Sequence, residues 1–338
     1  MSSRNPAAVI FGCAGPTLAT AERDFFRSAN PLGFILFQRN CETPEQVRRL
    51  VAALRDSVGR ADAPVLIDQE GGRVARLKPP HWPTYPSAAG IAALGGGRAA
   101  EAAWTAARLI ADDLSALGIT VDCLPVLDVP VMGADNVIGD RAYGHSPDLV
   151  VLLGRAAAEG LLAGGVLPVM KHMPGHGRAL VDSHHALPRV EAPRTVLETS
   201  DFAAFRALAH LPLAMTAHLV YQSIDAERPA TLSARVIDEV IRASIGFDGL
   251  LLTDDLSMQA LGGSFAERAQ AALQAGCDVV LHCNGEPAEM TEIAAVVPPL
   301  TTQAQDRFAR AEAMRRSPQP IERAALEARF RALMGSEA

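Results

Sequence analysis

The segment from Lys171 to His185 gathers the residue types that move protons near neutral pH. It holds four of the nine histidines of the chain, together with a lysine and Asp182, and it shows neither helical nor strand periodicity. Loops of this length in compact domains are usually functional. Because imidazole changes its charge between pH 5 and 8, the segment indicates proton-transfer chemistry.

Two other interpretations of these histidines stay open. Imidazole is a common zinc ligand, but Pro174 and Gly175 separate His172 from His176 and prevent the helix that would place both rings on one face. No cysteine lies nearby, so we expect no metal. The segment could also be a surface loop whose histidines are incidental.

A second reactive residue type stands after the apolar run Leu250–Thr253, where Asp254 follows directly. A carboxylate at the end of a strand can attack the anomeric carbon of a sugar and hold it as a covalent ester. One of the two residues Asp254 and Asp255 could instead cap the following segment.

A retaining glycosidase also needs an acid that later serves as a base, usually a second carboxylate about 5 Å from the first. His184 is the better candidate here, because Asp182 precedes it by two residues. Residues two apart in an extended loop share a side, so Asp182 could orient and charge the imidazole as in a catalytic triad. His185 competes for this role, but it would point in the opposite direction, and the pairing with Asp182 selects His184.

These residues need a scaffold, and apolar runs that alternate with helical patterns predict one. Strand-helix alternation implies parallel strands, and continuous apolar runs imply strands buried on both faces. Eight such units favour a closed (β/α)8 TIM barrel of α/β class. An open, doubly wound sheet stays an alternative, because Gly12 and Gly15 weakly resemble a dinucleotide-binding loop, without GxGxxG. The expected strands are Ala8–Phe11, Gly33–Phe37, Pro64–Ile67, Thr120–Leu124, Val166–Met170, Leu213–Thr216, Gly249–Leu252 and Asp278–Leu281.

Helix start signals support this alternation. Thr43–Gln46 is a capping box with proline at the first helical position, and Gly59 ends the helix that follows. Ser146-Pro147 predicts the start of another helix, and Ser264–Glu267 is a second capping box. From Pro287 onward the pattern is helical and charged, so we expect C-terminal packing helices and a single domain over residues 1–338.

In a barrel of this kind, function lies in the loops that follow the strands. The polar residues found there are rich in carboxylates and arginines, with a tryptophan for stacking, which suits a neutral, polyhydroxylated ligand. They are Gln38–Asn40, Asp68–Arg76, His81, Trp82, Tyr85, Asp128, Asp140, Arg141, the histidine-rich segment, His218, Asp254, Asp255, His282 and Asn284.

Composition excludes several other classes of protein. A net charge of -7 gives no basic footprint for nucleic acid or an anionic membrane. The five cysteines are scattered without a CxxC pair, as in a reducing compartment. The apolar run over residues 7–11 is too short for a signal-peptide core, and no uncharged run reaches the length of a membrane span. We expect a cytoplasmic monomer that binds a small carbohydrate and no cofactor.

Several motifs together resemble the bacterial β-N-acetylglucosaminidases of glycoside hydrolase family 3, the NagZ type. The matches run in order from about Gly33 to Asn284, with Met173 where this family usually has phenylalanine. They comprise Gly33–Phe37, Asp68–Val74, Pro125–Val129, Lys171–Gly177, Asp182–His184 and Asp254–Met258.

The resemblance implies a single-domain barrel, retaining hydrolysis and no metal. It also implies a substrate, N-acetylglucosamine β-1,4-linked to 1,6-anhydro-N-acetylmuramic acid, with or without peptide, in cytoplasmic peptidoglycan recycling. The roles that it implies are Asp254 as nucleophile, His184 as acid/base, Asp182 as the partner of His184, and Asp68, Arg76, Arg141, Lys171 and His172 as sugar-binding residues.

The residue types agree with these roles. Asp68 and Arg76 could bracket vicinal hydroxyls, and Lys171 could donate to hydroxyls of the same ring. Arg141 could instead form a surface salt bridge, but its place at the expected active face favours contact with a ligand. His176, between two glycines, is expected to shape the loop by hydrogen bonding.

Other functions remain as alternatives. A β-glucosidase or a glycoside phosphorylase could use the same scaffold, since a histidine acid/base carries no negative charge to repel phosphate. A metal-dependent hydrolase could use His172, His176 and His218. A sugar-binding protein without catalysis is the last alternative.

Overall fold

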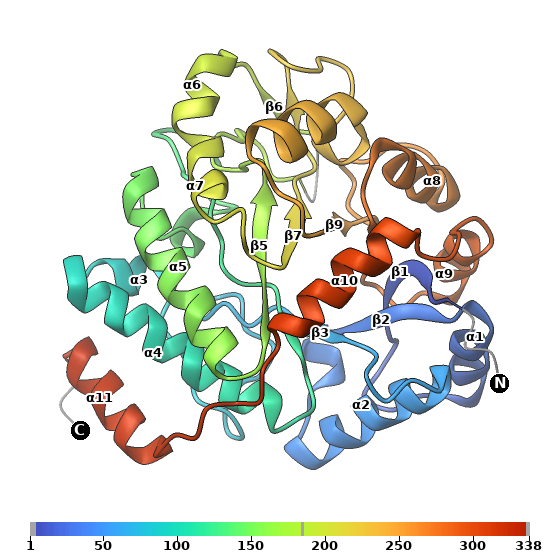
Figure 1. The fold of residues 1–338 in the computed structure, drawn as a ribbon. Helices are drawn as coiled ribbons and strands as arrows, with labels where there is room; N and C mark the ends of the chain where they lie inside the picture. Colours follow the sequence, from blue (N-terminus) through green and yellow to red (C-terminus); the bar gives the residue numbers. More distant parts are fainter. Residues whose placement is uncertain (1–4, 184–185, 336–338) are drawn as a thin grey trace.

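Eight parallel strands form a closed barrel in the computed structural model, which describes residues 5–183 and 186–335 (Figure 1). Neighbours around the barrel follow the order β1-β10-β9-β7-β5-β4-β3-β2, and every pairing is parallel. Each expected strand overlaps one of these, so the (β/α)8 prediction is confirmed and the open sheet is not formed. The barrel strands are β1 (Ala7–Gly12), β2 (Pro31–Leu36), β3 (Val65–Ile67), β4 (Val121–Asp122), β5 (Leu167–Met173), β7 (Leu213–Thr216), β9 (Leu250–Asp255) and β10 (Val279–His282).

Helices surround the barrel, and a small additional sheet lies outside it. That sheet pairs β6 (Arg189–Val190) with β8 (Val220–Tyr221). The α-helices are α1 (Thr20–Ala29), α2 (Pro44–Val58), α3 (Ala88–Ala92), α4 (Gly96–Ser115), α5 (Pro147–Ala163), α6 (Arg194–Thr199), α7 (Asp201–Ala207), α8 (Phe265–Ala275), α9 (Pro287–Ala294), α10 (Thr302–Met314) and α11 (Arg323–Met334). The 3-10 helices are η1 (Gln38–Asn40), η2 (Gly139–Arg141) and η3 (Ala230–Leu232), and η4 (Val236–Ser244) is a π-helix.

The barrel strands are apolar throughout because both of their faces are buried. In β1, Ile10 belongs to the cluster that fills the barrel, whereas its neighbours Val9 and Phe11 belong to the larger cluster that includes helix residues. Successive side chains of a strand point to opposite faces, so one run of apolar residues serves both layers. The two large clusters, one inside the barrel and one between barrel and helices, hold the fold together.

Helices begin at each start signal that the sequence contains, although only one of the two expected capping boxes is complete. Thr43 accepts the Gln46 N–H at 3.2 Å, and α2 ends at Gly59, whose φ is 63°. The Gln46 side chain bonds the Glu42 N–H at 2.9 Å, one residue before the partner that a capping box would use. At α8, Ser264 and Glu267 form the complete capping box. These ends fix where each helix returns to the barrel.

The helix α10 closes the barrel end at which the strands begin, and it crosses in front of the strands in Figure 1. Its Ala304 and Ala311 join the cluster that fills the barrel. Arg307 bonds Asp278, which directly precedes β10, at 2.9 Å. The helices after Pro287 therefore pack against the barrel, as expected, and leave its opposite end for a site.

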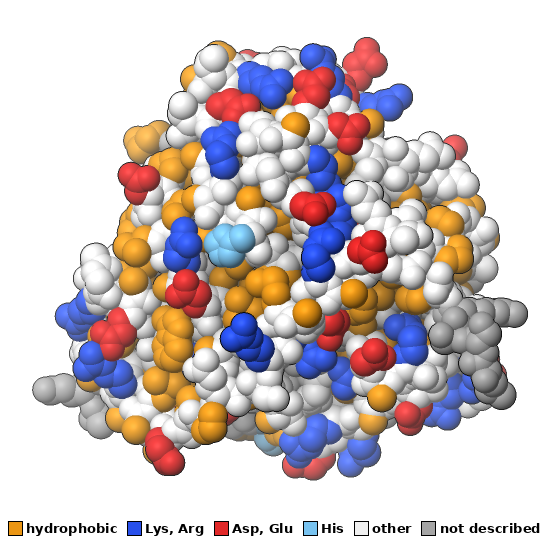
Figure 2. Space-filling model, in the orientation of Figure 1, with side chains coloured by type: hydrophobic (Ala, Val, Ile, Leu, Met, Phe, Trp, Pro, Cys, Tyr) orange, Lys and Arg blue, Asp and Glu red, His pale blue; other side chains and the backbone are white. Residues whose placement is uncertain are grey.

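The face that α10 covers carries side chains of both charge signs, interspersed with apolar ones (Figure 2). Among the described residues, no helix has the length and apolar character needed to cross a membrane.

One expected boundary was wrong. The interpretation of the segment after Met170 as an irregular loop fails for its first residues, because β5 continues through Met173. The Leu127 N–H donates to the Lys171 carbonyl at 2.7 Å, and the Ala217 N–H donates to the Met173 carbonyl at 2.8 Å. These bonds from both neighbouring segments keep the backbone extended, although lysine and histidine interrupt the apolar run. Lys171 and His172 consequently stand on the barrel itself.

Candidate active site

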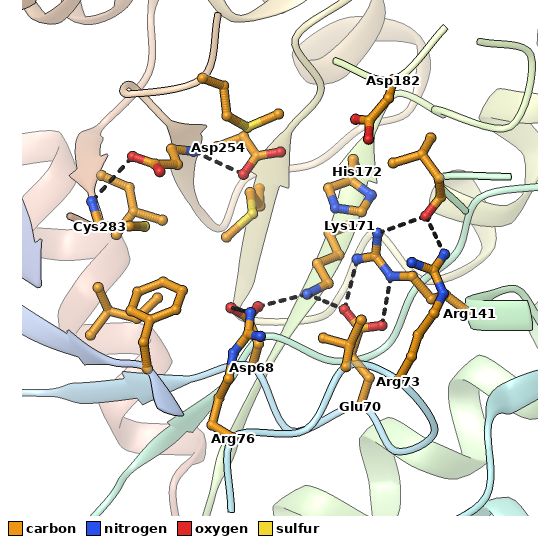
Figure 3. Close-up of a pocket in the computed structure, with 18 residues that line it drawn as sticks. Asp68, Glu70, Arg73, Arg76, Arg141, Lys171, His172, Asp182, Asp254 and Cys283 are labelled. Carbon is orange, nitrogen blue, oxygen red and sulfur yellow. Dashed lines mark hydrogen bonds and ion pairs between the residues drawn. The ribbon is translucent and has the colours of Figure 1, made fainter. Parts of the chain in front are cut away.

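A cavity of about 300 Å³ lies at the carboxyl ends of the barrel strands (Figure 3). Most of its charged lining comes from the segments after β3 and β4 and from the end of β5, and Asp254 comes from the end of β9. The remaining lining is largely apolar. The lining comprises Ile35, Phe37, Asp68, Glu70, Arg73, Val74, Arg76, Val137, Arg141, Lys171, His172, Asp182, Met215, Asp254, Asp255, Met258, Leu281 and Cys283.

Five charged side chains form one wall of the cavity, and Lys171 lies at its centre. We call this set, Asp68, Glu70, Arg76, Arg141 and Lys171, the charged wall. The Nζ of Lys171 lies 2.8 Å from Asp68 Oδ1 and 2.6 Å from Glu70 Oε1. Glu70 also binds Arg141 through two hydrogen bonds, of 2.8 and 2.7 Å, and Asp68 also accepts from Arg76 at 3.1 Å. The wall is therefore a chain of ion pairs that holds five side chains in fixed positions before any ligand arrives.

The wall stays ionised although it is buried. Burial would raise the pKa of Glu70, but the charges of Lys171 and Arg141 outweigh burial and lower it to about 2. Burial likewise opposes the charge of Lys171, but Asp68 and Glu70 raise the pKa of its ammonium group. At neutral pH the cavity therefore presents fixed carboxylates and fixed donors, the groups that bind sugar hydroxyls.

His172 is oriented by a buried carboxylate. Asp128 Oδ2 lies 2.7 Å from His172 Nδ1, and Asp128 Oδ1 accepts the backbone N–H groups of His172, at 3.2 Å, and His176, at 2.6 Å. Burial would raise the pKa of Asp128, but His172 holds it below the ordinary value. The ionised carboxylate places the imidazole proton on Nδ1, so the other ring nitrogen remains for the cavity.

Asp254 reaches the cavity from the end of β9. Burial would raise its pKa, but the charges of His172 and His218 and the backbone N–H of Asp255 hold the pKa below the ordinary value. The Asp255 N–H donates to Asp254 Oδ1 at 2.8 Å. Asp254 is thus an ionised carboxylate at the mouth of a barrel, which is the state in which a carboxylate attacks carbon.

Asp255 takes the structural role that the sequence left open between the two aspartates. Its Oδ1 accepts the Ser257 N–H at 3.0 Å and the Cys283 N–H at 3.1 Å, and the Ser257 hydroxyl donates to its other oxygen. These bonds close the turn after β9 and tie it to β10.

Asp182 lines the same cavity, and in Figure 3 it lies above His172, whereas Asp254 lies to the left of His172. His184, the expected acid/base, and its neighbour His185 fall outside the described residues. The pairing of Asp182 with His184 therefore stays a prediction.

The two other histidines near the cavity are bonded to protein groups. The ring Nε2 of His176 lies 3.1 Å from the Ser183 hydroxyl, as expected of a residue that shapes the loop, and burial lowers its pKa to about 4. His218 is bonded to Thr231, at 2.7 Å, and to the carbonyl of Asp255, at 3.0 Å. In the described part of the chain, no group of three or more His, Cys, Asp or Glu side chains is arranged to hold a metal ion.

All five expected sugar-binding residues line the cavity, and the sequence reasoning missed the residues that hold them. Glu70 and Asp128 follow strands but received no role. The sequence held one partial signal for Glu70, because it lies two residues after Asp68 and the two carboxylates of an extended segment share a side. Arg141 forms a salt bridge with Glu70, but both side chains are largely buried, so this is not the surface salt bridge of the alternative interpretation. Arg141 lines the cavity, and its contact with a ligand stays a prediction.

The expectation that Trp82 stacks on a sugar in the cavity was wrong. Trp82 is buried in the main hydrophobic cluster and does not line the cavity. The proline-rich loop that carries it folds onto α4, where the Tyr85 hydroxyl donates to Asp113 at 2.8 Å. The apolar surface of the cavity comes instead from residues such as Phe37 and Met215.

Comparisons with known proteins agree with this geometry. Residues 18–314 match the model of the glycosyl hydrolase family 3 N-terminal domain. A β-hexosaminidase of Alkalilimnicola ehrlichii is 40% identical over 283 residues, which cover 82% of this chain and 80% of that protein. The structure of NagZ from Neisseria gonorrhoeae in complex with N-trifluoroacetyl-D-glucosamine is 30% identical, with a TM-score of 0.86 over 99% of this chain and 98% of that chain. A family 3 β-N-acetylglucosaminidase of Paenibacillus is 31% identical, with a TM-score of 0.84 over 97% of this chain and 67% of that longer chain.

Proposed function

The chain belongs to glycosyl hydrolase family 3 and is a glycoside hydrolase with β-N-acetylhexosaminidase activity, and we propose that it is a retaining exo-β-N-acetylglucosaminidase with Asp254 as nucleophile. One observation carries the proposal: the ionised carboxylate of Asp254 shares a single cavity with the five expected sugar-binding residues. A catalytic domain over residues 1–338, acting as a monomer without a cofactor, belongs to the same proposal.

The chemistry has two steps. In the first, Asp254 attacks the anomeric carbon, the bond to the leaving-group oxygen breaks, and His184 gives that oxygen its proton. In the second, His184 takes a proton from water, the water oxygen attacks the anomeric carbon, and the carboxylate of Asp254 leaves. Asp182 orients His184 and stabilises its charged form, as an aspartate does in a triad.

The charged wall supplies the binding. Asp68 accepts hydrogen bonds from ring hydroxyls, Arg76, Arg141 and Lys171 donate to hydroxyl or acyl oxygens, and the ring nitrogen of His172 that does not bind Asp128 accepts from a hydroxyl. Because ion pairs already hold the charged members of this set, little side-chain entropy is lost when the sugar binds.

The proposed substrate is N-acetylglucosamine at the non-reducing end of a peptidoglycan fragment, β-1,4-linked to 1,6-anhydro-N-acetylmuramic acid with or without peptide. The similarity to NagZ of N. gonorrhoeae, whose structure holds an N-acylated glucosamine, supports the sugar. The reaction would serve cell-wall recycling in the cytoplasm.

The anomeric form of the first product tests the proposal. We expect proton NMR of an aryl β-N-acetylglucosaminide digest to show the β anomer of N-acetylglucosamine first, with or without phosphate. The α anomer would exclude a retaining mechanism, and a sugar phosphate in the phosphate arm would make the protein a phosphorylase.

A further inference from the structure

A buried glutamine joins the two ends of the segment that carries most of the charged wall. Gln69 lies between Asp68 and Glu70 in the segment that follows β3, and it is 2% exposed. Asp68 and Glu70 line the cavity, whereas Gln69 does not. Successive side chains of an extended segment point to opposite sides, so the two carboxylates face the cavity and the amide between them faces the protein interior.

The amide of Gln69 binds the backbone at the far end of this segment. Its Oε1 accepts the backbone N–H of Arg76 at 2.8 Å and that of Leu77 at 3.0 Å, and its Nε2 donates to the Leu77 carbonyl at 3.2 Å. A primary amide carries the same donor and acceptor as a peptide group, so the side chain bonds the backbone here as a neighbouring strand would.

The backbone of Gln69 is fixed to the barrel as well. Its N–H donates to Asp122 Oδ1 at 2.9 Å, and Asp122 is completely buried in β4, which pairs with β3. Gln69 is thus bonded to the barrel through its backbone and to the start of Arg76 through its side chain. A movement of Arg76 away from the barrel would have to break these bonds.

Arg76 is the residue of the charged wall that depends on Gln69. Its guanidinium bonds Asp68 at 3.1 Å, and its Cζ lies 5.0 Å from the centre of the Phe37 ring (Figure 3). These two contacts direct the end of the side chain. The bond from the Arg76 N–H to Gln69 determines where that side chain begins relative to Asp68, which lies eight residues earlier in the chain.

We propose that Gln69 is a positioning residue for sugar binding, because its amide sets the spacing between the Asp68 carboxylate and the Arg76 guanidinium. The inference rests on the proposed function in one respect, that the charged wall binds N-acetylglucosamine. A carboxylate and a guanidinium that are held at the spacing of two sugar oxygens bind them with little loss of side-chain entropy. The same two groups bind more weakly when their spacing varies.

Gln69→Met tests the inference in the full-length enzyme, because methionine has a similar length and lacks the donor and acceptor of the amide. The matched control is Gln46→Met, at a second buried glutamine. Its amide bonds backbone groups of Glu42, Pro16 and Asn40, none of which lines the cavity. Gln69→Glu is the conservative variant, because a carboxyl oxygen still accepts both N–H groups.

Steady-state kinetics on an aryl β-N-acetylglucosaminide give kcat and KM, and calorimetry gives the Kd of free N-acetylglucosamine. For Gln69→Met we expect KM and Kd to rise about tenfold, with kcat within about threefold of the unmodified enzyme. Gln46→Met should leave both constants within about twofold, even where its urea midpoint falls as far as that of Gln69→Met. Gln69→Glu should keep both constants within about threefold.

A second comparison tests whether Gln69 acts through Arg76. In an Arg76→Ala background, Gln69→Met should raise the Kd of N-acetylglucosamine by less than about twofold, because the side chain that Gln69 positions is gone. An undiminished tenfold rise in that background would show that Gln69 acts on another part of the site and would overturn the inference.

An unchanged Kd in folded Gln69→Met protein, or an equal rise in Gln46→Met, would also overturn it. If Gln69→Met does not fold, Gln69→Asn takes its place, since this amide is one methylene too short to reach Arg76, and the same rise is expected. Absence of turnover by the unmodified enzyme, with Kd values in the expected order across the variants, would refute the proposed function and leave the inference intact.

Discussion

Clusters of ionised side chains occupy both ends of the barrel, and their surroundings differ. Beneath α10, Arg307 bonds Asp278 and Asp248, each at 2.9 Å, and Arg242 bonds Asp278 at 2.9 Å. Asp278 also accepts the backbone N–H of Leu251 at 2.9 Å. This cluster ties α10 to the strands that begin beside it.

The cluster at the other end has similar pairs but surrounds a cavity. Lys171, Glu70 and Arg141 are as tightly paired as the residues beneath α10, yet they line about 300 Å³ of space that a ligand can fill. Buried ion pairs alone are weak evidence of function, because many serve only the fold. The adjoining cavity, which Asp254 also lines, distinguishes the two clusters, and the predictions below test that distinction.

The largest effect is expected from Asp254→Ala. Loss of the nucleophile should lower kcat/KM for an aryl β-N-acetylglucosaminide by about 1000-fold or more. The free energy of unfolding should change by less than about 1.5 kcal/mol, because the substitution removes a buried charge along with its hydrogen bond. Steady-state kinetics and urea unfolding measure the two quantities, and turnover within tenfold of the unmodified enzyme would refute the role of Asp254.

Arg307→Ala should show the opposite pattern. It leaves Asp278 with one cationic partner in place of two and loosens α10, so the free energy of unfolding should fall by about 3 kcal/mol. The value of kcat/KM should stay within about twofold, since the cavity lies at the other barrel end. Arg310→Ala is the matched control, because its pair with Asp248 is exposed and should contribute less than about 1 kcal/mol. A large loss of activity in folded Arg307→Ala protein would show that the two ends are not independent.

Glu70→Gln should affect both quantities. The substitution removes the charge that holds Lys171 and Arg141, so KM should rise about tenfold, and kcat should change less because Glu70 does not reach the reacting atoms. The free energy of unfolding should fall by about 2 kcal/mol. Asp278→Asn, its counterpart beneath α10, should affect stability only. An unchanged KM in Glu70→Gln would mean that the charged wall does not bind the sugar.

The smallest effect concerns pH and His176, whose pKa burial lowers from 6.5 to about 4. The unfolded chain takes up the proton first, so the His176 contribution is complete above pH 6.5 and is lost as pH falls toward 4. The loss should amount to at most about 1.4 kcal/mol per pH unit. In urea unfolding at pH 7, 6 and 5, a His176→Asn variant should lose less stability than the unmodified protein. Parallel losses would indicate that His176 is charged in the folded state.

The strands could be predicted because a strand that is buried on both faces needs a continuous run of apolar residues, and such a run is visible in the sequence. Runs such as Leu213–Thr216 are apolar whatever lies around them, and the sequence places them to within a few residues. The end of β5 was not predictable in this way. Lys171 and His172 look irregular in the sequence, and only hydrogen bonds from segments distant in the chain keep them extended.

In the site, too, the features that local sequence determines could be predicted, and those that depend on distant segments could not. Asp254, Asp68 and Lys171 carry reactive groups at strand ends, so their shared place at the mouth of the barrel could be predicted. The role of Glu70 depends on Lys171 and Arg141, which are about a hundred and about seventy residues away along the chain, and no local pattern encodes those contacts. The prediction that Trp82 stacks on a sugar was wrong for the same reason, because packing against distant helices determines which way its loop folds.

The most direct test of the account is to trap the covalent intermediate. A fluorinated N-acetylglucosaminyl inactivator, followed by proteolysis and mass spectrometry, identifies the residue that carries the sugar. We predict a single modified peptide with the sugar ester on Asp254. A sugar on any other residue, or inactivation without a covalent adduct, would contradict the central claim that the aspartate at the end of β9 is the nucleophile.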